Sequence, residues 1–193
     1  LGFDMSFCSA TKYFSGHSDA MGGTLAVNKK VYKKISFFYK LSGYRMSADE
    51  AYLIIRGLRT LDVRLNAHFE NTKLVINFLK KQKKIKEVLY PHKIKSNNYK
   101  LWKKYYKGAT GLFSVVIKSK KKSSVIKFVN SLELFGIGYS WGGFESLALF
   151  QNLSKNRNYY RFNSDEHIVR FHIGLEDPKD LINDLKKCLR YIK

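Results

Sequence analysis

The first sixty residues contain short apolar runs separated by turn-forming residues. Residues 2–8 alternate loosely between apolar and polar positions, which predicts a short strand. Residues 22–27 predict a second strand, in which glycines allow close backbone approach. Residues 31–41 are rich in aromatics and predict a helix, and Ser47 is placed to cap a further helix that runs through Arg56.

From Leu58 to about Lys81, apolar residues recur at helical spacing and predict a long amphipathic helix. The period then changes, and strands and helices alternate to the end of the chain. The predicted strands are 88–90, 111–117, 135–139 and 168–173; the predicted helices are 98–106, 125–132 (capped by Ser123-Ser124) and one opened by Asp177-Pro178. The last helix would bury Leu181, Ile182, Leu185, Leu189 and Ile192. This alternation predicts an α/β or α+β sandwich from Leu58 onward, with a domain boundary near Leu58.

Composition excludes several classes of protein. With 193 residues, of which 45% are hydrophobic, the chain can form a buried core of one domain or slightly more. The net charge of +21 comes largely from lysine, 28 of the 36 basic residues, in short runs that we interpret as solvated surface of a protein from an AT-rich genome. We therefore expect no nucleic-acid partner. No apolar run is long enough for a membrane span and no signal peptide is evident, so a cytoplasmic location is expected.

Two cysteines, Cys8 and Cys188, lie far apart and in no metal-binding spacing, so no disulfide framework is indicated. The five histidines form no metal-binding motif either, and we expect no metal. His68, His92, His167 and His172 are interpreted as packing or surface residues. The fifth histidine, His17, lies in the polar turn described next.

The stretch from Ser9 to Asp19 combines a lysine with hydroxyl and turn-forming residues. Lys12 directly follows Thr11 and lies three residues after Ser9. A lysine that forms a Schiff base with pyridoxal phosphate needs hydroxyls for the phosphate and an amine that acts as nucleophile and base. By residue type alone, such a lysine is also typical of solvated surface, and such hydroxyls are typical of turns.

The wider pattern resembles the pyridoxal-phosphate attachment signature of the cystathionine/methionine-metabolism enzymes. The resemblance rests on Asp4-Met5, on residues 9–14 and on Gly16-His17-Ser18 at fixed spacing, and it continues through residues 51–53, 56–61, 140–147 and 169–177. It implies an α/β protein of the PLP-dependent transferase fold type I. Residues 1–58 would be the C-terminal end of the large PLP-binding domain, and residues 59–193 the complete small α/β sandwich domain.

The resemblance implies pyridoxal 5'-phosphate (PLP) as the cofactor, attached to Lys12. Lys12 would also remove the α-proton of the substrate and protonate the leaving thiolate. Ser9 and Thr11 match the hydroxyl residues that bind the cofactor phosphate.

Three later residues match the substrate end of the family's site. Arg170 lies among apolar residues of a predicted strand, so its charge should be paired or face a cleft, although the solvent face of the strand is an alternative. The resemblance implies that its planar guanidinium holds the substrate α-carboxylate. Ser140 and Trp141 correspond to residues that contact the substrate. A tryptophan at this place, where γ-acting relatives usually have leucine, indicates the bacterial β-lyase branch, although a core tryptophan is an alternative.

The implied reaction is β-elimination of cystathionine to homocysteine, pyruvate and ammonia in methionine biosynthesis, by an enzyme that is a homotetramer in full-length relatives. Family members carry about as much chain again before the lysine, including the residues that contact the pyridine ring and a phosphate loop. We therefore expect a C-terminal portion that is inactive alone. The alternatives are a γ-acting relative (cystathionine γ-synthase or γ-lyase) and a non-enzymatic basic binding module.

Overall fold

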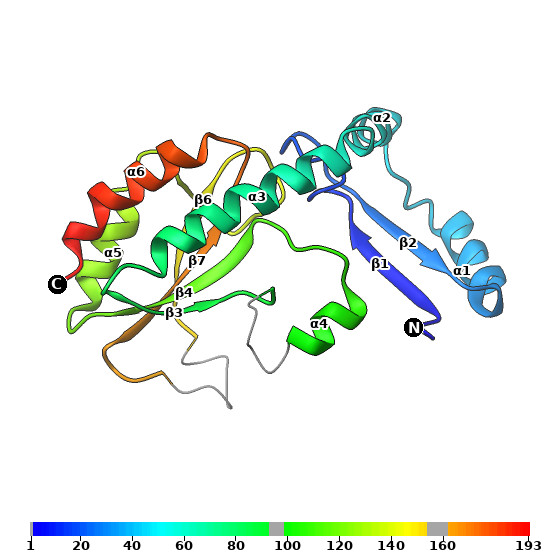
Figure 1. Cartoon of the computed structure of the whole chain (residues 1–193). Coiled ribbons are helices and arrows are strands. Elements are labelled where there is room, and N and C mark those ends of the chain that lie inside the picture. The colour runs from blue at the N-terminus through cyan, green and yellow to red at the C-terminus, as the bar shows by residue number, and fades with distance from the viewer. Residues whose placement is uncertain (1, 93–98, 154–161) are drawn as a thin grey trace. The chain divides into compact units, whose positions relative to one another are not determined.

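The structure, a computed structural model, describes residues 2–92, 99–153 and 162–193, and it divides the chain into two compact units, Leu1–Asp62 and Val63–Lys193 (Figure 1). The assignment of residues 1–58 to a large domain and of residues 59–193 to a small domain stays a prediction. No helix in the described ranges is long and apolar enough to cross a membrane.

The first unit contains an antiparallel pair of strands, β1 (Met5–Ser9) and β2 (Gly23–Val27), in which Ser9 lies opposite Gly23. Helix α1 (Lys29–Ser42) follows, and helix α2 (Ala48–Leu58) begins after Ser47, whose hydroxyl accepts the N–H of Glu50. All four elements and the Ser47 cap agree with the sequence prediction.

Few residues of the first unit form its core. Ala10, Ala20 and Ile54 are buried, and Phe14, Met46 and Leu53 pack against them. Helix α1 has no buried residue. Large apolar side chains are exposed along the unit: Phe3, Met5, Phe7, Met21, Leu25, Tyr32, Phe37, Phe38, Tyr39, Leu41, Tyr44, Tyr52, Ile55 and Leu58. An apolar surface of this extent is typical of an interface.

The second unit is built on a mixed five-stranded sheet in the order β3-β4-β7-β6-β5. Its strands are β3 (Ile85–Leu89), β4 (Leu112–Lys118), β5 (Gly136–Ile137), β6 (Leu147–Gln151) and β7 (Glu166–His172). All neighbours are antiparallel except β5 and β6, which are parallel. The strand that carries Arg170, β7, is therefore the central one.

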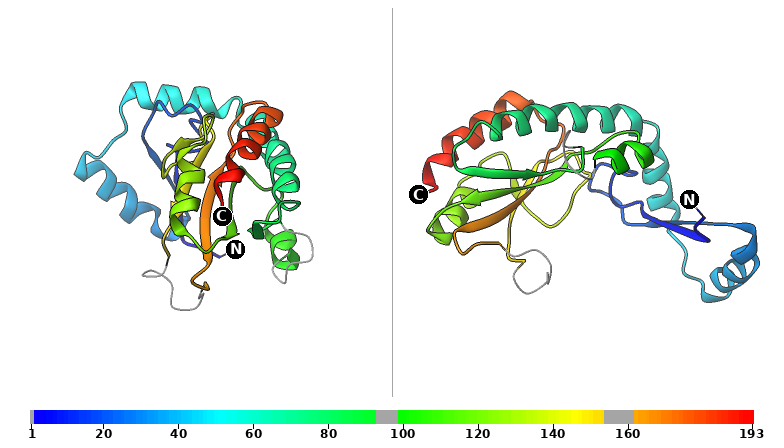
Figure 2. Two further views of the ribbon diagram at one scale, coloured as in Figure 1. Left: turned by 90° about the vertical axis from the view of Figure 1, so that its left-hand side faces the viewer. Right: turned by 60° about the horizontal axis from the view of Figure 1, so that its bottom comes forward.

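Helices cover one face of this sheet. They are α3 (Leu61–Leu79), α5 (Lys122–Asn130) and α6 (Pro178–Cys188, continued by a 3-10 turn, Leu189–Tyr191); the short α4 (Tyr99–Tyr105) follows β3 (Figure 2). Residues of α3, α5 and α6 share one core cluster with Val169 and Phe171 of β7 and with Phe113 and Val115 of β4. Since side chains alternate along a strand, Arg170 projects from the opposite face.

Most predicted elements of the second unit are present, with three differences. Strand β6 was not predicted, because residues 147–150 form a short apolar run without alternation. Strand β5 contains only two residues, so Ser140 and Trp141 lie in the loop beyond it and not at a strand end. Ser124 lies inside α5 and does not cap it; its hydroxyl donates to the Lys121 carbonyl at 2.7 Å.

Replacing Phe171 by alanine should destabilise the second unit strongly. The ring is fully buried, 5.5 Å from the Phe113 ring and 5.6 Å from the Phe135 ring (centroid distances). We expect the free energy of unfolding to fall by about 3–5 kcal/mol, measured by urea denaturation. Leu74→Ala, at a half-exposed position of α3, is the matched control and should change it by less than about 1 kcal/mol. A similar loss in both variants would contradict this assignment of the core.

Candidate active site

The lysine turn, residues 9–16, follows directly from β1 and is held against Gly22. The backbone N–H groups of Ala10 and Thr11 both donate to the Gly22 carbonyl, at 2.9 and 3.2 Å. The Thr11 hydroxyl donates to the same carbonyl at 3.2 Å and accepts the Gly22 N–H at 2.9 Å. Because Gly22 lies just before β2, the strand pair fixes where the turn begins.

Lys12 lies in the middle of this turn, with its backbone held on both sides. Its N–H donates to the Ser9 carbonyl at 3.3 Å, and its carbonyl accepts the Gly16 N–H at 2.8 Å. The fully buried Ser15 hydroxyl donates to the Thr11 carbonyl at 3.0 Å. Gly16 has φ +70°, a left-handed conformation that glycine adopts without strain. The side chain of Lys12 is half-buried.

Helix α2 packs directly on the lysine turn through Gly57. A Cβ atom at Gly57 would lie 2.3 Å from the carbonyl oxygens of Phe14 and Ser15, which is too close for any side chain. Ile54, one turn earlier in α2, is buried in the same small cluster as Ala10. The turn is thus supported by a helix on one side and by Gly22 on the other.

Arg170 is the second predicted functional residue, and it contacts the loop that carries Ser140. Its Nη2 donates to the carbonyl oxygens of Gly138 at 3.1 Å and Ser140 at 3.3 Å. Burial lowers the pKa of the Arg170 guanidinium, which still remains charged at neutral pH. Within the described ranges, no carboxylate forms an ion pair with Arg170. This half-buried cation is therefore suited to bind a carboxylate of a ligand.

Residues 140–146, here called the tryptophan loop, are fastened to the chain that follows β7. The backbone N–H and the hydroxyl of Ser146 donate to the two Glu176 carboxylate oxygens, at 2.6 and 2.8 Å. The Ser146 hydroxyl also accepts the Gly174 N–H at 2.9 Å, and Leu175 donates to the Phe144 carbonyl at 2.8 Å. Ser140 is exposed and Trp141 is half-buried in this loop.

Two buried histidines lie behind the loop. His172, at the end of β7, is 1% exposed, and its ring centroid lies 5.2 Å from that of the fully buried His68. Burial lowers the pKa of His172 to about 4 and also lowers the pKa of His68. Both imidazoles are therefore neutral at physiological pH.

The structure groups the predicted residues by unit. Ser9, Thr11 and Lys12 lie together in the first unit; Ser140, Trp141 and Arg170 lie together in the second. The roles proposed for them in the sequence analysis stay predictions.

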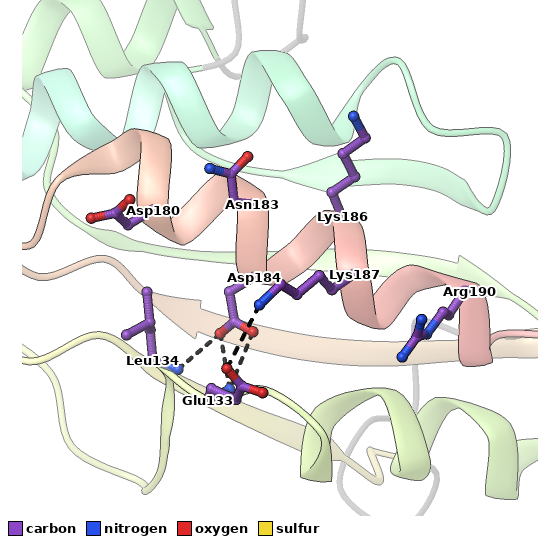
Figure 3. A pocket seen from close by; sticks show the side chains of 8 residues that line it. All are labelled: Glu133, Leu134, Asp180, Asn183, Asp184, Lys186, Lys187 and Arg190. Carbon is purple, nitrogen blue, oxygen red and sulfur yellow. Dashed lines mark hydrogen bonds and ion pairs between the residues drawn. The ribbon is translucent and has the colours of Figure 1, made fainter.

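An open groove of about 730 Å³ beside α6 contains none of these six residues (Figure 3). It is lined by Glu133, Leu134, Asp180, Asn183, Asp184, Lys186, Lys187 and Arg190. The Asp184 carboxylate accepts the backbone N–H groups of Glu133 and Leu134, at 3.0 and 2.9 Å, and so fixes the turn before β5. We interpret the groove as structural.

Residues 1–190 match the family of Cys/Met metabolism PLP-dependent enzymes. The chain belongs to this family. A curated relative, cystathionine beta-lyase of Escherichia coli (strain K12), is 38% identical over 189 residues, which cover 96% of this chain and 48% of that protein. L-alanine/L-glutamate racemase of Wolbachia pipientis wMel is 37% identical over 190 residues, which cover 97% of this chain and 47% of that protein.

Among solved structures, cystathionine gamma synthase from Xanthomonas oryzae pv. oryzae in complex with cystathionine matches with a TM-score of 0.85 and 29% identity. The match covers 98% of this chain and 50% of that chain. It confirms the predicted fold type I architecture. This chain spans about half the length of the curated relatives it matches.

The residues of the lysine turn fit the family's cofactor, PLP. Lys12 would offer the amine for the aldehyde carbon. The half-buried Ser9 hydroxyl has no hydrogen-bond partner among the described residues, so it can donate to a phosphate oxygen. The Thr11 hydroxyl is already engaged with Gly22, and its role in positioning the turn was not evident from the sequence.

The sequence analysis also did not identify Gly22, Gly57 or His172 as parts of the site. Gly57 lies in a matched motif, but only the three-dimensional contact with the turn explains why this residue is glycine. His172 lies two residues after Arg170, and this spacing on one strand was the available signal that both project from the same face.

Thr11→Val should destabilise the lysine turn, whereas Ser9→Ala should not. Valine keeps the shape of threonine but removes both hydrogen bonds to Gly22 and leaves the Gly22 N–H without its partner. We expect Thr11→Val to cost about 1–3 kcal/mol, seen as faster amide hydrogen exchange in residues 10–16. Ser9→Ala should leave exchange unchanged and weaken PLP binding. Equal exchange in both variants would contradict the structural role of Thr11.

The stability of the second unit should fall as the pH is lowered from about 6.5 toward 4. The folded state holds His172 neutral down to about pH 4, whereas an unfolded histidine binds a proton near pH 6.5. In this window the unfolded state binds more protons, so up to about 3 kcal/mol of stability, present above pH 6.5, is lost on acidification. Urea denaturation between pH 4.5 and 7 measures this. His172→Gln should show a smaller loss over the same range; an identical loss would contradict the assignment.

Proposed function

We propose that this chain supplies the catalytic lysine and the substrate-carboxylate site of a PLP-dependent lyase that cleaves cystathionine by β-elimination. The observation that carries the proposal is the lysine turn. Lys12 is presented by a turn that Gly22 and α2 hold in place, beside a Ser9 hydroxyl that is available to a phosphate. A solvated surface lysine does not need such support.

In this proposal the two units have separate tasks. PLP, when bound, supplies an electron sink that stabilises the negative charge left on the substrate α-carbon after loss of its proton. Lys12 Nζ holds the cofactor, accepts the α-proton and delivers a proton to the leaving sulfur. Ser9 donates to the cofactor phosphate, and Thr11 keeps the turn in position.

Arg170 orients the substrate. Its guanidinium is held by two loop carbonyls and has no carboxylate partner within the described ranges, so its remaining donors can bind the substrate α-carboxylate. Ser140 and Trp141 contact the substrate beyond that carboxylate. Fixing one end of the substrate in this way reduces the number of orientations that the substrate can adopt, which is an entropic contribution to the rate.

Two features favour β-elimination among the family's reactions. The sequence has tryptophan at residue 141, and the Escherichia coli relative named cystathionine beta-lyase is 38% identical. The Xanthomonas structure is named a gamma synthase and the Wolbachia relative a racemase, so γ-chemistry and racemisation are the outcomes that an assay must distinguish.

The exposed apolar side chains of the first unit support a further proposal about assembly. Among its described residues the unit has a core cluster of three buried apolar residues and a helix α1 without any, and an exposed apolar surface of this kind is typical of one covered by other polypeptide. The relatives are about twice as long as this chain. We infer that polypeptide equivalent to their other half completes the cofactor pocket, in a cytoplasmic homo-oligomer, and that residues 1–193 alone do not turn over cystathionine.

The first test is selective labelling. The chain is incubated with PLP, reduced with borohydride and mapped by peptide mass spectrometry. Because the lysine turn is preformed, we expect the label to concentrate at Lys12 and to disappear from that peptide in Lys12→Ala. Lys29→Ala, which removes an exposed lysine of the same unit, is the matched control and should leave the labelling unchanged. Even labelling of many lysines would contradict the proposed site.

The reaction is then tested with the chain produced together with the N-terminal half of the Escherichia coli relative. Pyruvate from cystathionine would support β-elimination, 2-oxobutyrate would identify a γ-lyase, and D-alanine from L-alanine would identify a racemase. Pyruvate release by residues 1–193 alone would contradict the inferred inactivity of the isolated chain.

A further inference from the structure

The tryptophan loop has an unusual backbone conformation directly after Trp141. Gly142 has φ +84°, a left-handed conformation that favours glycine, and both Gly142 and Gly143 are buried. The conformation at Gly142 sets the direction in which the chain leaves Trp141. A contact that fixes the backbone of Gly142 therefore also restrains the main chain at Trp141.

The imidazole of His172 makes that contact. The Gly142 N–H donates to His172 Nε2 at 3.0 Å, and the Gly143 carbonyl oxygen lies 3.2 Å from the same nitrogen. The residue is 1% exposed, so bulk water does not compete for the contact. Gly111, the residue directly before β4, leaves space for the ring, because a Cβ there would lie 3.0 Å from the Cε1 and Nδ1 atoms of His172.

We propose that His172 is a positioning residue that fixes Trp141 by accepting the Gly142 N–H, so that the substrate end of the site depends on a neutral imidazole. The consequence for catalysis rests on the proposed function, in which Trp141 contacts the substrate. The consequence for the loop does not depend on it.

The groups that surround the ring keep it neutral over the physiological range. His68 approaches from α3, Glu145 from the loop, and Arg170 from β7. Burial is the main reason why the pKa of His172 is lowered to about 4; the contact with the Gly143 carbonyl raises it, His68 and Arg170 lower it, and Glu145 raises it. Protonation would place a hydrogen on Nε2, which then faces the Gly142 N–H as a second donor and turns to the Gly143 carbonyl instead.

The chain offers a direct optical test, because Trp102 and Trp141 are its only two tryptophans. In a Trp102→Phe background, emission reports on Trp141 alone, without cofactor or activity. We expect His172→Ala to shift the emission and to raise the acrylamide quenching constant, because the loop loses its acceptor. His172→Gln, whose side-chain oxygen can accept the same N–H, should largely restore both.

A pH titration distinguishes whether His172 acts by accepting the Gly142 N–H or only by filling space. With His172 present, Trp141 emission should change in a transition centred near pH 4, and His172→Gln should lack it because glutamine does not titrate. His167→Gln, at a half-buried position of the same strand, is the matched control and should keep the transition. Far-UV circular dichroism establishes that each variant is folded at each pH.

The proposal is overturned if His172→Gln disturbs Trp141 as much as His172→Ala does, or if it keeps the acid transition. If His172→Ala fails to fold, the presence or absence of the acid transition in His172→Gln still tests the proposal. In the reconstituted enzyme we expect His172→Ala to lower kcat/KM for cystathionine about tenfold, with recovery in His172→Gln. If the optical results hold and no cystathionine is cleaved, the positioning role stands and the proposed function fails.

Discussion

The packing of α3, α5 and α6 on one face of the sheet is the constraint on which the second unit depends. Along β7, Val169 and Phe171 face the helices and form the core, so Arg170, which lies between them, must project from the other face. A guanidinium among the helices would need a buried partner, and burying an unpaired charge is costly. On the opposite face, Arg170 is held by two loop carbonyls and stays available to a ligand. The alternation of one strand thus separates core from site.

The tryptophan loop shows how a loop without regular structure can be held rigidly. Several of its polar contacts come from one short segment: His172 binds its beginning, and Gly174, Leu175 and Glu176 bind its end. Gly174 has no room for a side chain, since a Cβ there would lie 2.1 Å from the Phe144 carbonyl oxygen. Buried polar groups that are satisfied in this way specify one conformation, because any alternative would leave them without partners.

The sequence was sufficient to predict the elements whose signals are local. Ser47 and Asp177 act as caps as predicted, since a cap depends on residues within one turn. The apolar period likewise predicted the buried face of α6. The parts that were missed depend on contacts between distant residues: Gly57 against the lysine turn, Thr11 against Gly22, and His172 against Gly142. The spacing of residues along the sequence does not reveal contacts between distant residues. The family resemblance indicated which motifs belong to the site, but it did not show which contacts hold them in place.

The lysine turn and the rest of the first unit are stabilised in different ways, and this difference affects what Lys12 can do chemically. The lysine turn is fixed by hydrogen bonds within residues 9–22 and by the close contact of Gly57, so its shape does not need a large core. The rest of the unit exposes apolar side chains of β1, β2 and α1, with few buried residues to hold them together. The lysine turn is therefore held more firmly than the rest of the first unit. The turn can therefore present the amine of Lys12 without support from a large core. Presentation is sufficient for a lysine to react with an aldehyde, whereas proton transfer at carbon also requires the enclosed, low-dielectric surroundings that a complete pocket provides.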